Sequence, residues 1–210
     1  MDLGIGRTFF PVYEFELERE LRDCASLLDL GCGGSSPIRP FSKGLFCVGI
    51  DAHEPSLEAS KRSGIHDEYY RMDALDAGER FGPASFDCVL ASDLIEHLTK
   101  EQGLGLMQVM ETIARKKVII LTPNGFLEQG EHDDNPLQLH RSGWTVDEMR
   151  AKGYKVKGIN GWKPLRKEQS EIRFEPRWLW EFVSGLTQQY VRDHPKHAYQ
   201  ILCVKTVGRP

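Results

Sequence analysis

Short apolar runs alternate with longer amphipathic stretches along most of the chain, and this alternation predicts strands that alternate with helices. The predicted strands are residues 25–28, 45–50, 69–72, 86–91, 117–121, 154–159 and 199–207. Amphipathic or capped helical patterns cover residues 12–22, 54–64, 92–115, 145–152 and 178–191. A strand–helix alternation of this length predicts one doubly wound α/β sheet of seven strands.

Several helix ends and interruptions can be predicted from single residues. Pro55 suits the first turn of a helix. Thr145 and Glu148 have the spacing of a capping box at the start of another helix. Gly103 and Gly105 interrupt the apolar pattern of the helix that follows the fourth strand and is expected to run to about residue 115. The segment at residues 78–85 is expected to be a loop.

The first predicted strand runs into a glycine-rich turn, Asp29-Leu30-Gly31-Cys32-Gly33-Gly34-Ser35. Glycine lets the backbone turn sharply and approach a ligand where a Cβ atom would clash. Ligands of open parallel sheets bind at the carboxyl ends of the strands, so this turn is expected to form the floor of a nucleotide-like site. The second strand ends in Asp51, about 20 residues further on, where such folds hydrogen-bond a ribose. Tight turns without a ligand use the same glycines, so the turn alone leaves both interpretations open.

Four motifs that follow one another along the chain narrow this choice. They are Leu27-Leu28-Asp29-Leu30-Gly31-Cys32-Gly33, Val48-Gly49-Ile50-Asp51, Arg71-Met72-Asp73-Ala74 and Phe86-Asp87-Cys88-Val89-Leu90-Ala91-Ser92-Asp93. Their order and spacing resemble those of the class I S-adenosylmethionine (SAM) dependent methyltransferases, over residues 24–162. Ser35 departs from the family, which has a third glycine there. The resemblance implies a Rossmann-like sheet that is mostly parallel with an antiparallel last strand.

The resemblance also implies SAM as the cofactor and assigns residues to its parts. Asp51 is expected to accept hydrogen bonds from the ribose hydroxyls, and Asp73 from the adenine amine. The backbone of Gly31 and Gly33 is expected beside the methionine portion, with Asp29 near its ammonium group. Taken singly, each of these carboxylates is better explained as a solvated or helix-capping group, whereas the combined set favours SAM. The predicted cofactor-binding residues are Asp29, Gly31, Gly33, Asp51, Ala52, Met72, Asp73, Ala74 and Ser92.

Two histidines follow the fourth and fifth predicted strands, on the side of the site where an acceptor would bind. They are His97 and His140. A base is needed only if the acceptor must lose a proton, and histidine is the commonest group for that task. We therefore predict His97 and His140 as the catalytic residues, with simple packing under the cleft as an equal alternative for His97.

The same region offers a metal-binding alternative. Asp93, Glu96 and His97 have the i, i+3, i+4 spacing of one helix face. With His140 they resemble the metal site of small-RNA 3′-end 2′-O-methyltransferases, which suits Mg²⁺ or Mn²⁺ and has Glu at the first position. Asp93 and Glu96 also have the spacing of a capping box for a helix that begins there. We favour the capping interpretation and predict no metal.

The resemblance implies that the acceptor site lies in two insertions, residues 126–143 and 161–177. The first is also long for a polar connection in a compact domain, and such loops are often functional. Trp144, Trp162, Trp178 and Trp180 lie around the two insertions. These rings could stack on an acceptor, but for Trp178 and Trp180 we favour packing against the sheet. The expected acceptor is a small molecule, a glycan or a lipid precursor, methylated on oxygen or nitrogen. The alternatives are a metal-assisted RNA 2′-O-methyltransferase and a SAM-binding protein without transferase activity.

Composition limits the remaining possibilities. The 210 residues suffice for one α/β domain, and we interpret residues 1–210 as a single domain that opens with an N-terminal helix region at residues 1–22. The net charge of −4 argues against nucleic acid as a partner.

No apolar run is long enough for a membrane span and no signal peptide is evident, so we expect a cytoplasmic protein with reduced cysteines. No tyrosine has a lysine four residues later, which argues against a short-chain dehydrogenase. The oligomeric state stays open.

Overall fold

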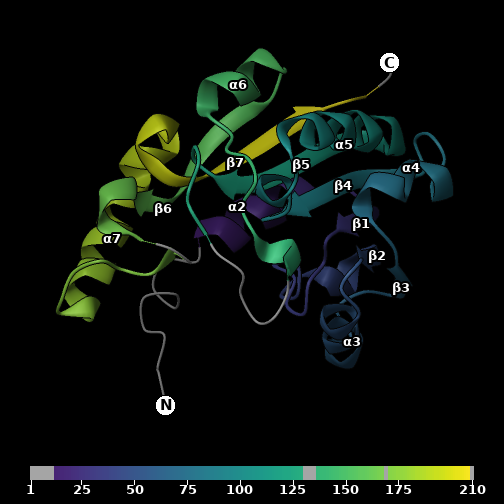
Figure 1. Ribbon diagram of the computed structural model, residues 1–210, viewed down its shortest axis with the longest axis horizontal. Coiled ribbons are helices and arrows are strands. Elements are labelled where there is room, and N and C mark those ends of the chain that lie inside the picture. Colours follow the sequence, from purple (N-terminus) through teal and green to yellow (C-terminus); the bar gives the residue numbers. More distant parts are fainter. Residues whose placement is uncertain (1–11, 130–135, 168–169, 209–210) are drawn as a thin grey trace.

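A seven-stranded sheet forms the centre of the computed structural model, which describes residues 12–129, 136–167 and 170–208 (Figure 1). The strands are β1 (Ser26–Leu30), β2 (Phe46–Asp51), β3 (Glu68–Arg71), β4 (Phe86–Ser92), β5 (Ala114–Pro123), β6 (Lys155–Trp162) and β7 (Ala198–Thr206). Their order in the sheet is β3-β2-β1-β4-β5-β7-β6. The first five strands pair in parallel, and β7 pairs antiparallel with both β5 and β6. The predicted sheet with an antiparallel last strand is confirmed.

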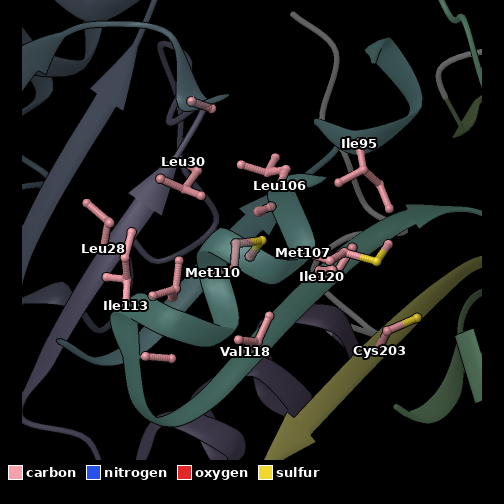
Figure 2. Packing of buried hydrophobic residues seen from close by; sticks show 14 of the residues in the cluster. Leu28, Leu30, Ile95, Leu106, Met107, Met110, Ile113, Val118, Ile120 and Cys203 are labelled. Atoms are coloured by element: carbon pink, nitrogen blue, oxygen red, sulfur yellow. The ribbon is translucent and has the colours of Figure 1, made fainter. Parts of the chain in front are cut away.

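Helices pack against both faces of this sheet. They are α2 (Val12–Leu21), α3 (Glu54–Ser63), α4 (Ala77–Arg80), α5 (Lys100–Ile113), α6 (Val146–Ala151) and α7 (Arg177–Asp193). Because neighbouring side chains of a strand point to opposite faces, Leu28 of β1 packs in the cluster with Met110 of α5, shown in Figure 2, whereas Leu27 packs in a second cluster with Leu17 of α2. All five cysteines are buried free thiols. Among the described residues, no helix has the length and apolar character that crossing a bilayer requires.

The segment that follows β4 differs from its prediction. Ile95–His97 form a single 3-10 turn, η3, and α5 begins only at Lys100. Its N-cap is Thr99, whose side chain accepts from the N–H of Gln102, while the Gln102 side chain accepts from the N–H of Thr99. Asp93 has a positive φ of 49° and does not cap a helix. The predicted Asp93–Glu96 capping box is therefore wrong, because an equivalent box six residues later begins the helix instead.

The interruption of the apolar pattern near Gly103 and Gly105 does not break the helix, because both glycines lie inside α5. A Cβ atom at Gly103 would lie 2.5 Å from the buried Trp144 ring, so this glycine makes room for a side chain from another segment. The expected loop at residues 78–85 begins within the short helix α4. At α6 the prediction is confirmed, because Thr145 and Glu148 form the expected capping box.

Strand β6 and helix α7 approach each other most closely at two glycines. A Cβ atom at Gly158 would collide with the backbone carbonyl of Val191, in α7, and with Ala198. Gly161 has a positive φ of 71° and faces Ser184 of α7. The Gln188 side chain accepts from the N–H of Gly161 and donates to the carbonyl of Gly158. These contacts hold α7 against β6, at the end of the sheet where one wall of the site forms.

Candidate active site

The carboxyl ends of the central strands border a cavity of about 980 Å³. Its walls come from the turn after β1, the segment after β4, both predicted insertions, and one face of α7. Six of the predicted site residues line it together: Asp29, Gly31, Gly33, Ser92, His97 and His140. The other predicted residues, Asp51, Ala52, Met72, Asp73 and Ala74, are not part of its lining.

The glycine turn has the conformation that its sequence requires. Gly31 and Gly33 have positive φ angles of 65° and 57°, which residues with a side chain rarely adopt. A Cβ atom at Gly31 would also lie 2.9 Å from the side chain of Leu94. The N–H of Gly33 donates to Asp51 Oδ2 at 2.9 Å, and the N–H of His53 donates to Asp51 Oδ1 at 2.8 Å. Asp51 therefore ties the turn after β1 to the end of β2.

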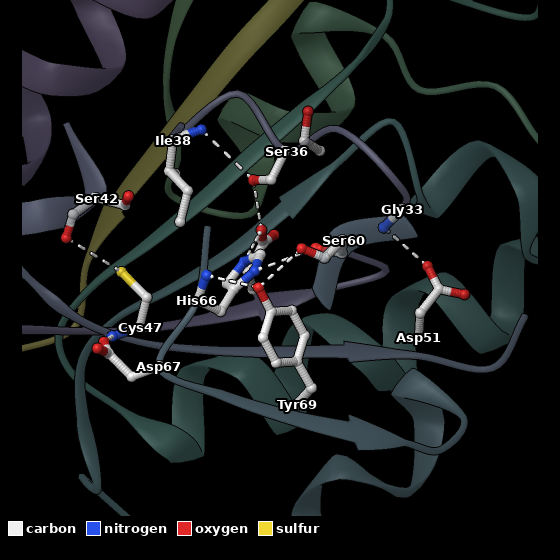
Figure 3. Close-up of polar contacts among 12 residues, drawn as sticks. Gly33, Ser36, Ile38, Ser42, Cys47, Asp51, Ser60, His66, Asp67 and Tyr69 are labelled. Atoms are coloured by element: carbon white, nitrogen blue, oxygen red, sulfur yellow. Dashed lines mark hydrogen bonds and ion pairs between the residues drawn. The ribbon is translucent and has the colours of Figure 1, made fainter. Parts of the chain in front are cut away.

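Asp29 lies at the back of the cavity with two partners that the sequence did not indicate. It is almost fully buried, and its Oδ2 accepts from Ser36 Oγ at 2.6 Å and hydrogen-bonds His66 Nε2 at 2.9 Å. Figure 3 labels the two partners, Ser36 and His66. The His66 ring fits against Gly49, where a Cβ atom would lie 3.0 Å from it. This buried network fixes the Asp29 carboxylate. Its expected contact with the ammonium group of a cofactor stays a prediction.

The residues expected around adenine lie at the ends of β2 and β3. The N–H of Met72 donates to the carbonyl of Asp51 at 3.2 Å, which places the two expected contact regions side by side. Asp73 Oδ1 accepts from the N–H of Leu75 and caps the 3-10 turn η2 (Ala74–Asp76). The three carboxylates expected to hold a cofactor thus come from three neighbouring strands. Asp29 lines the cavity. Asp51 does not, but it accepts a hydrogen bond from Gly33, which does. Asp73 is not part of the cavity lining.

A polar network at the tip of β4 includes two residues that the sequence did not single out. Tyr13 of α2 hydrogen-bonds Ser92 through their hydroxyl groups at 3.2 Å. Asp93 Oδ2 accepts from Ser92 Oγ, and Asp93 Oδ1 accepts from Gln200 of β7 at 2.7 Å. Burial raises the pKa of Tyr13 well above its ordinary value and raises the pKa of Asp93 to about 6. The open surface of Asp93 faces the cavity, which brings hydroxyl, amide and carboxylate groups to one wall.

Three side chains beside this network form a compact nitrogen and oxygen cluster. One potential ligand atom from each of Glu96, His97 and His140 lies within 4.8 Å of the others. The His97 and His140 rings meet edge to face with centroids 4.9 Å apart. Burial, with the charge of His140 adding to it, lowers the pKa of His97 to about 4, so His97 is neutral at neutral pH. A neutral imidazole beside a carboxylate is a suitable ligand set for a divalent metal ion.

Glu96 is the most buried member of this cluster. It is 2% exposed and accepts from Thr122 Oγ1 at 2.9 Å. Burial, followed by the nearby charge of Asp93, raises its pKa well above the ordinary value. Asp93 does not belong to the cluster, because its oxygens bond to Ser92 and Gln200. The predicted catalytic histidines therefore come together with Glu96, whereas Asp93, the fourth residue of the metal-binding alternative, lies apart from them.

Replacing Glu96 with glutamine is expected to stabilise the chelator-treated protein. A carboxyl group whose folded-state pKa is raised binds protons more tightly when folded, so its stability contribution falls as pH rises from the unfolded pKa through the folded one. Glu96→Gln should raise the free energy of unfolding by on the order of 1 kcal/mol at about pH 7.5 and leave it nearly unchanged at about pH 4. Urea unfolding at both pH values measures this. If the substitution changed the free energy of unfolding by an equal or larger amount at the lower pH, the charge of Glu96 would not destabilise the folded protein.

Both predicted insertions contribute to the cavity, although residues 130–135 lie outside the described residues. Arg166, from the second insertion, lines the cavity and donates to Ser184 Oγ of α7 at 3.1 Å. None of the four tryptophans lines the cavity. Trp144 is fully buried, and its ring N–H donates to the carbonyl of Ile95. The expectation that Trp178 packs against the sheet is wrong, because its side chain is among the most exposed apolar groups of the described residues.

The sequence was compared with models of protein families and with curated protein sequences. Residues 28–127 match the model of a family described as a methyltransferase domain. No curated protein sequence matches the chain.

Many solved structures are similar to the chain. A SAM-dependent methyltransferase from Archaeoglobus fulgidus has a TM-score of 0.56 and 15% identity, with 95% of this chain and 97% of that chain covered. The methyltransferase domain of bacterial CtHen1-C has a TM-score of 0.58 and 17% identity, with 93% and 97% covered. Magnesium protoporphyrin IX methyltransferase from Synechocystis, with bound SAM, has a TM-score of 0.54 and 13% identity, with 97% and 80% covered. At these identities the likeness shows a shared fold.

Proposed function

We propose that the chain transfers the methyl group of SAM to an acceptor, because residues 28–127 match the model of the methyltransferase domain family. The expected acceptor is a small molecule, a glycan or a lipid precursor with a reactive oxygen or nitrogen atom. The observation that carries this proposal is a shared cavity. The Gly31–Gly33 turn forms one part of it and the His97–His140 pair forms another. A cofactor on the turn and an acceptor beside the histidines would therefore meet.

The residues present fit SAM as a cofactor. Gly33 lines the cavity with a positive φ angle, and apart from its chain neighbours no atom of the described residues lies within 4 Å of where its Cβ atom would be, so its backbone is open to a ligand. Asp51, at the end of β2, offers a carboxylate to the ribose hydroxyls while it fixes the turn through Gly33. Bound SAM would supply a methyl group that its sulfonium already activates. The task left to the protein is to hold the acceptor in line with that methyl group, which can lower the barrier by several kcal/mol.

A second candidate function is metal-assisted methylation of an RNA 2′-hydroxyl. It is favoured by the cluster of Glu96, His97 and His140, whose nitrogen and oxygen atoms would hold Mg²⁺ or Mn²⁺. The loss of the Asp93–Glu96 capping box also removes the alternative explanation for Glu96. The net charge of −4 counts against an RNA substrate, so we rank this candidate second.

Incubation with methyl-labelled SAM separates these functions. Metabolite pools and RNA are offered as acceptors, each with and without a chelator. Label in a metabolite fraction supports the first function, and label in RNA that disappears with the chelator supports the second. The matched variants are His140→Asn, at the cluster, and His53→Asn, which also lines the cavity but lies on the glycine-turn side. SAM binding without any label transfer would identify a SAM-binding protein instead.

A further inference from the structure

Helix α7 presents a stripe of large apolar side chains to solvent. Trp178, Phe182, Leu186 and Tyr190 follow one another at intervals of four residues and are 67%, 53%, 60% and 50% exposed. Leu179 lies beside them and is also exposed. Residues at this spacing share one helix face. We call these five residues the α7 stripe. Such a stripe normally faces a protein core, so its exposure here requires an explanation.

The inward face of α7 already has its partners. Ser184, Gln188 and Val191 are buried, and Gln188 bonds to the backbone of β6 through both ends of its amide. Apart from Val191, the buried residues of this inward face are small or polar, and the outward face carries the large aromatic and leucine side chains. The helix is held to the sheet without burying the α7 stripe. Among the described residues, the rings of His194 and His197 lie against Tyr190, which is still 50% exposed.

The size of the α7 stripe is close to what a stable interface needs. Each of its large side chains leaves on the order of 100 Å² uncovered. Phe174, whose ring lies 5.1 Å from that of Trp180, adds another exposed aromatic group next to the helix. The total of several hundred Å² is at the upper limit for a monomer, whose largest apolar patch covers about 300–600 Å². It approaches the roughly 800 Å² that each partner buries in a standard interface.

The charges around the α7 stripe favour an apolar partner over a charged one. Arg177 lies 3.4 Å from Glu171 and 4.0 Å from Glu181. Arg192 lies 3.1 Å from Glu16 of α2. Both flanking arginines are therefore paired with carboxylates of the same chain. Helices that bind anionic lipid surfaces instead carry an excess of Lys and Arg beside their apolar face.

We propose that the α7 stripe pairs with the same stripe of a second copy of this chain around a twofold axis. The stripe is symmetric about a point midway between Phe182 and Leu186. In an antiparallel pair, Phe182 would therefore meet Leu186 of the second copy, and Trp178 would meet Tyr190 of the second copy. Self-complementarity of this kind is what a twofold interface requires. Side chains four residues apart also form the ridges with which helices most often interdigitate.

This pairing uses no residue that lines the cavity. The residues of α7 that line the cavity are Arg177, Glu181, Ser184, Gly185 and Gln188, and none of them belongs to the α7 stripe. The interface would therefore adjoin the cavity wall without taking residues from it. The proposal is independent of the proposed function, because it uses no residue of the cluster or of the glycine turn.

Analytical ultracentrifugation of the full chain, from about 1 to about 100 µM, tests the pairing. We expect a dimer whose dissociation constant rises at least about thirtyfold in Phe182→Lys, since truncating or charging a central interface residue has effects of this size. Phe46→Lys is the matched control, because Phe46 is a phenylalanine of similar exposure at the start of β2, far from α7 in the sheet order. It should leave the dimer unchanged. Near-ultraviolet circular dichroism confirms that both variants are folded.

Three results would overturn this assignment. In the first, the wild-type chain stays monomeric and sediments with phosphatidylcholine–phosphatidylserine vesicles, whereas Phe182→Lys does not sediment with them. This result would assign the α7 stripe to a lipid surface. A monomer that dimerises after deletion of residues 1–11 would assign it to those residues. A dimer that Phe182→Lys leaves intact would place the interface elsewhere.

Discussion

Asp51→Ala is expected to weaken SAM binding by at least about 100-fold. Two hydrogen bonds from ribose hydroxyls to a charged acceptor contribute about 1.5–3 kcal/mol each. The variant also removes the acceptor for the N–H groups of Gly33 and His53, which hold the glycine turn in place. Loss of ligand contacts and loss of the turn conformation therefore act in the same direction. Isothermal titration calorimetry measures the affinity of both proteins.

Asp73→Ala is the matched control for this prediction. Asp73 is expected to contact the adenine amine alone, and one of its oxygens already caps a 3-10 turn. We expect it to weaken SAM binding by about tenfold, corresponding to one adenine contact. If Asp51→Ala binds SAM as tightly as the wild type, or if Asp73→Ala has the larger effect, the assignment of the ribose to the end of β2 is wrong.

Gly158→Ala is expected to lower the free energy of unfolding by about 3 kcal/mol. The added methyl group would collide with the backbone carbonyl of Val191 and with Ala198, and neither can move by changing a rotamer. Relief requires α7 to shift away from β6. Because α7 forms a wall of the cavity, we also expect the acceptor KM to rise while the affinity for SAM stays near that of the wild type. Urea unfolding and steady-state kinetics measure the two effects.

Gly105→Ala provides a control of opposite sign. Gly105 lies inside α5 with open space where a Cβ atom would be, and alanine is favoured over glycine in a helix by about 1 kcal/mol. This variant should be slightly stabilised. Equal unfolding free energies for Gly158→Ala and the wild type would mean that β6 and α7 are less tightly packed than the structure indicates.

The strands and the glycine turn were predictable because their signals are local. Apolar runs bounded by polar residues define β1, β2 and β4, and each was predicted to within a few residues. The start of α5 was not predictable in the same way. Asp93–Glu96 and Thr99–Gln102 have equivalent capping spacings in the sequence. The choice between them follows from distant contacts, because Gln200 engages Asp93 and Thr122 engages Glu96.

Local sequence signals also identified some residues of the site, whereas residues placed by distant contacts were missed. Gly31, Gly33 and Asp51 lie in motifs whose spacing carries the signal. His66 reaches Asp29 across 37 positions, and Tyr13 reaches Ser92 across 79. No local pattern marks such partners. The His66 contact also depends on Gly49, which leaves room for the ring and whose role only the folded sheet reveals.

Helix α7 shows a third kind of difference. Its apolar positions predicted a helix packed against the sheet, and the helix is present at residues 177–193. However, the side that faces β6 is the polar one, because Gln188 satisfies the backbone of Gly158 and Gly161. Periodicity identifies a helix and an apolar face, but it does not say whether that face meets the same chain or another molecule.

Calorimetric titration of the full-length wild-type chain with SAM tests the central claim most directly. The account predicts saturable binding of one SAM molecule per chain, with S-adenosylhomocysteine competing for the same site. A folded chain that shows no saturable binding of SAM would contradict the assignment of the glycine turn and Asp51 to a methyl-donor site.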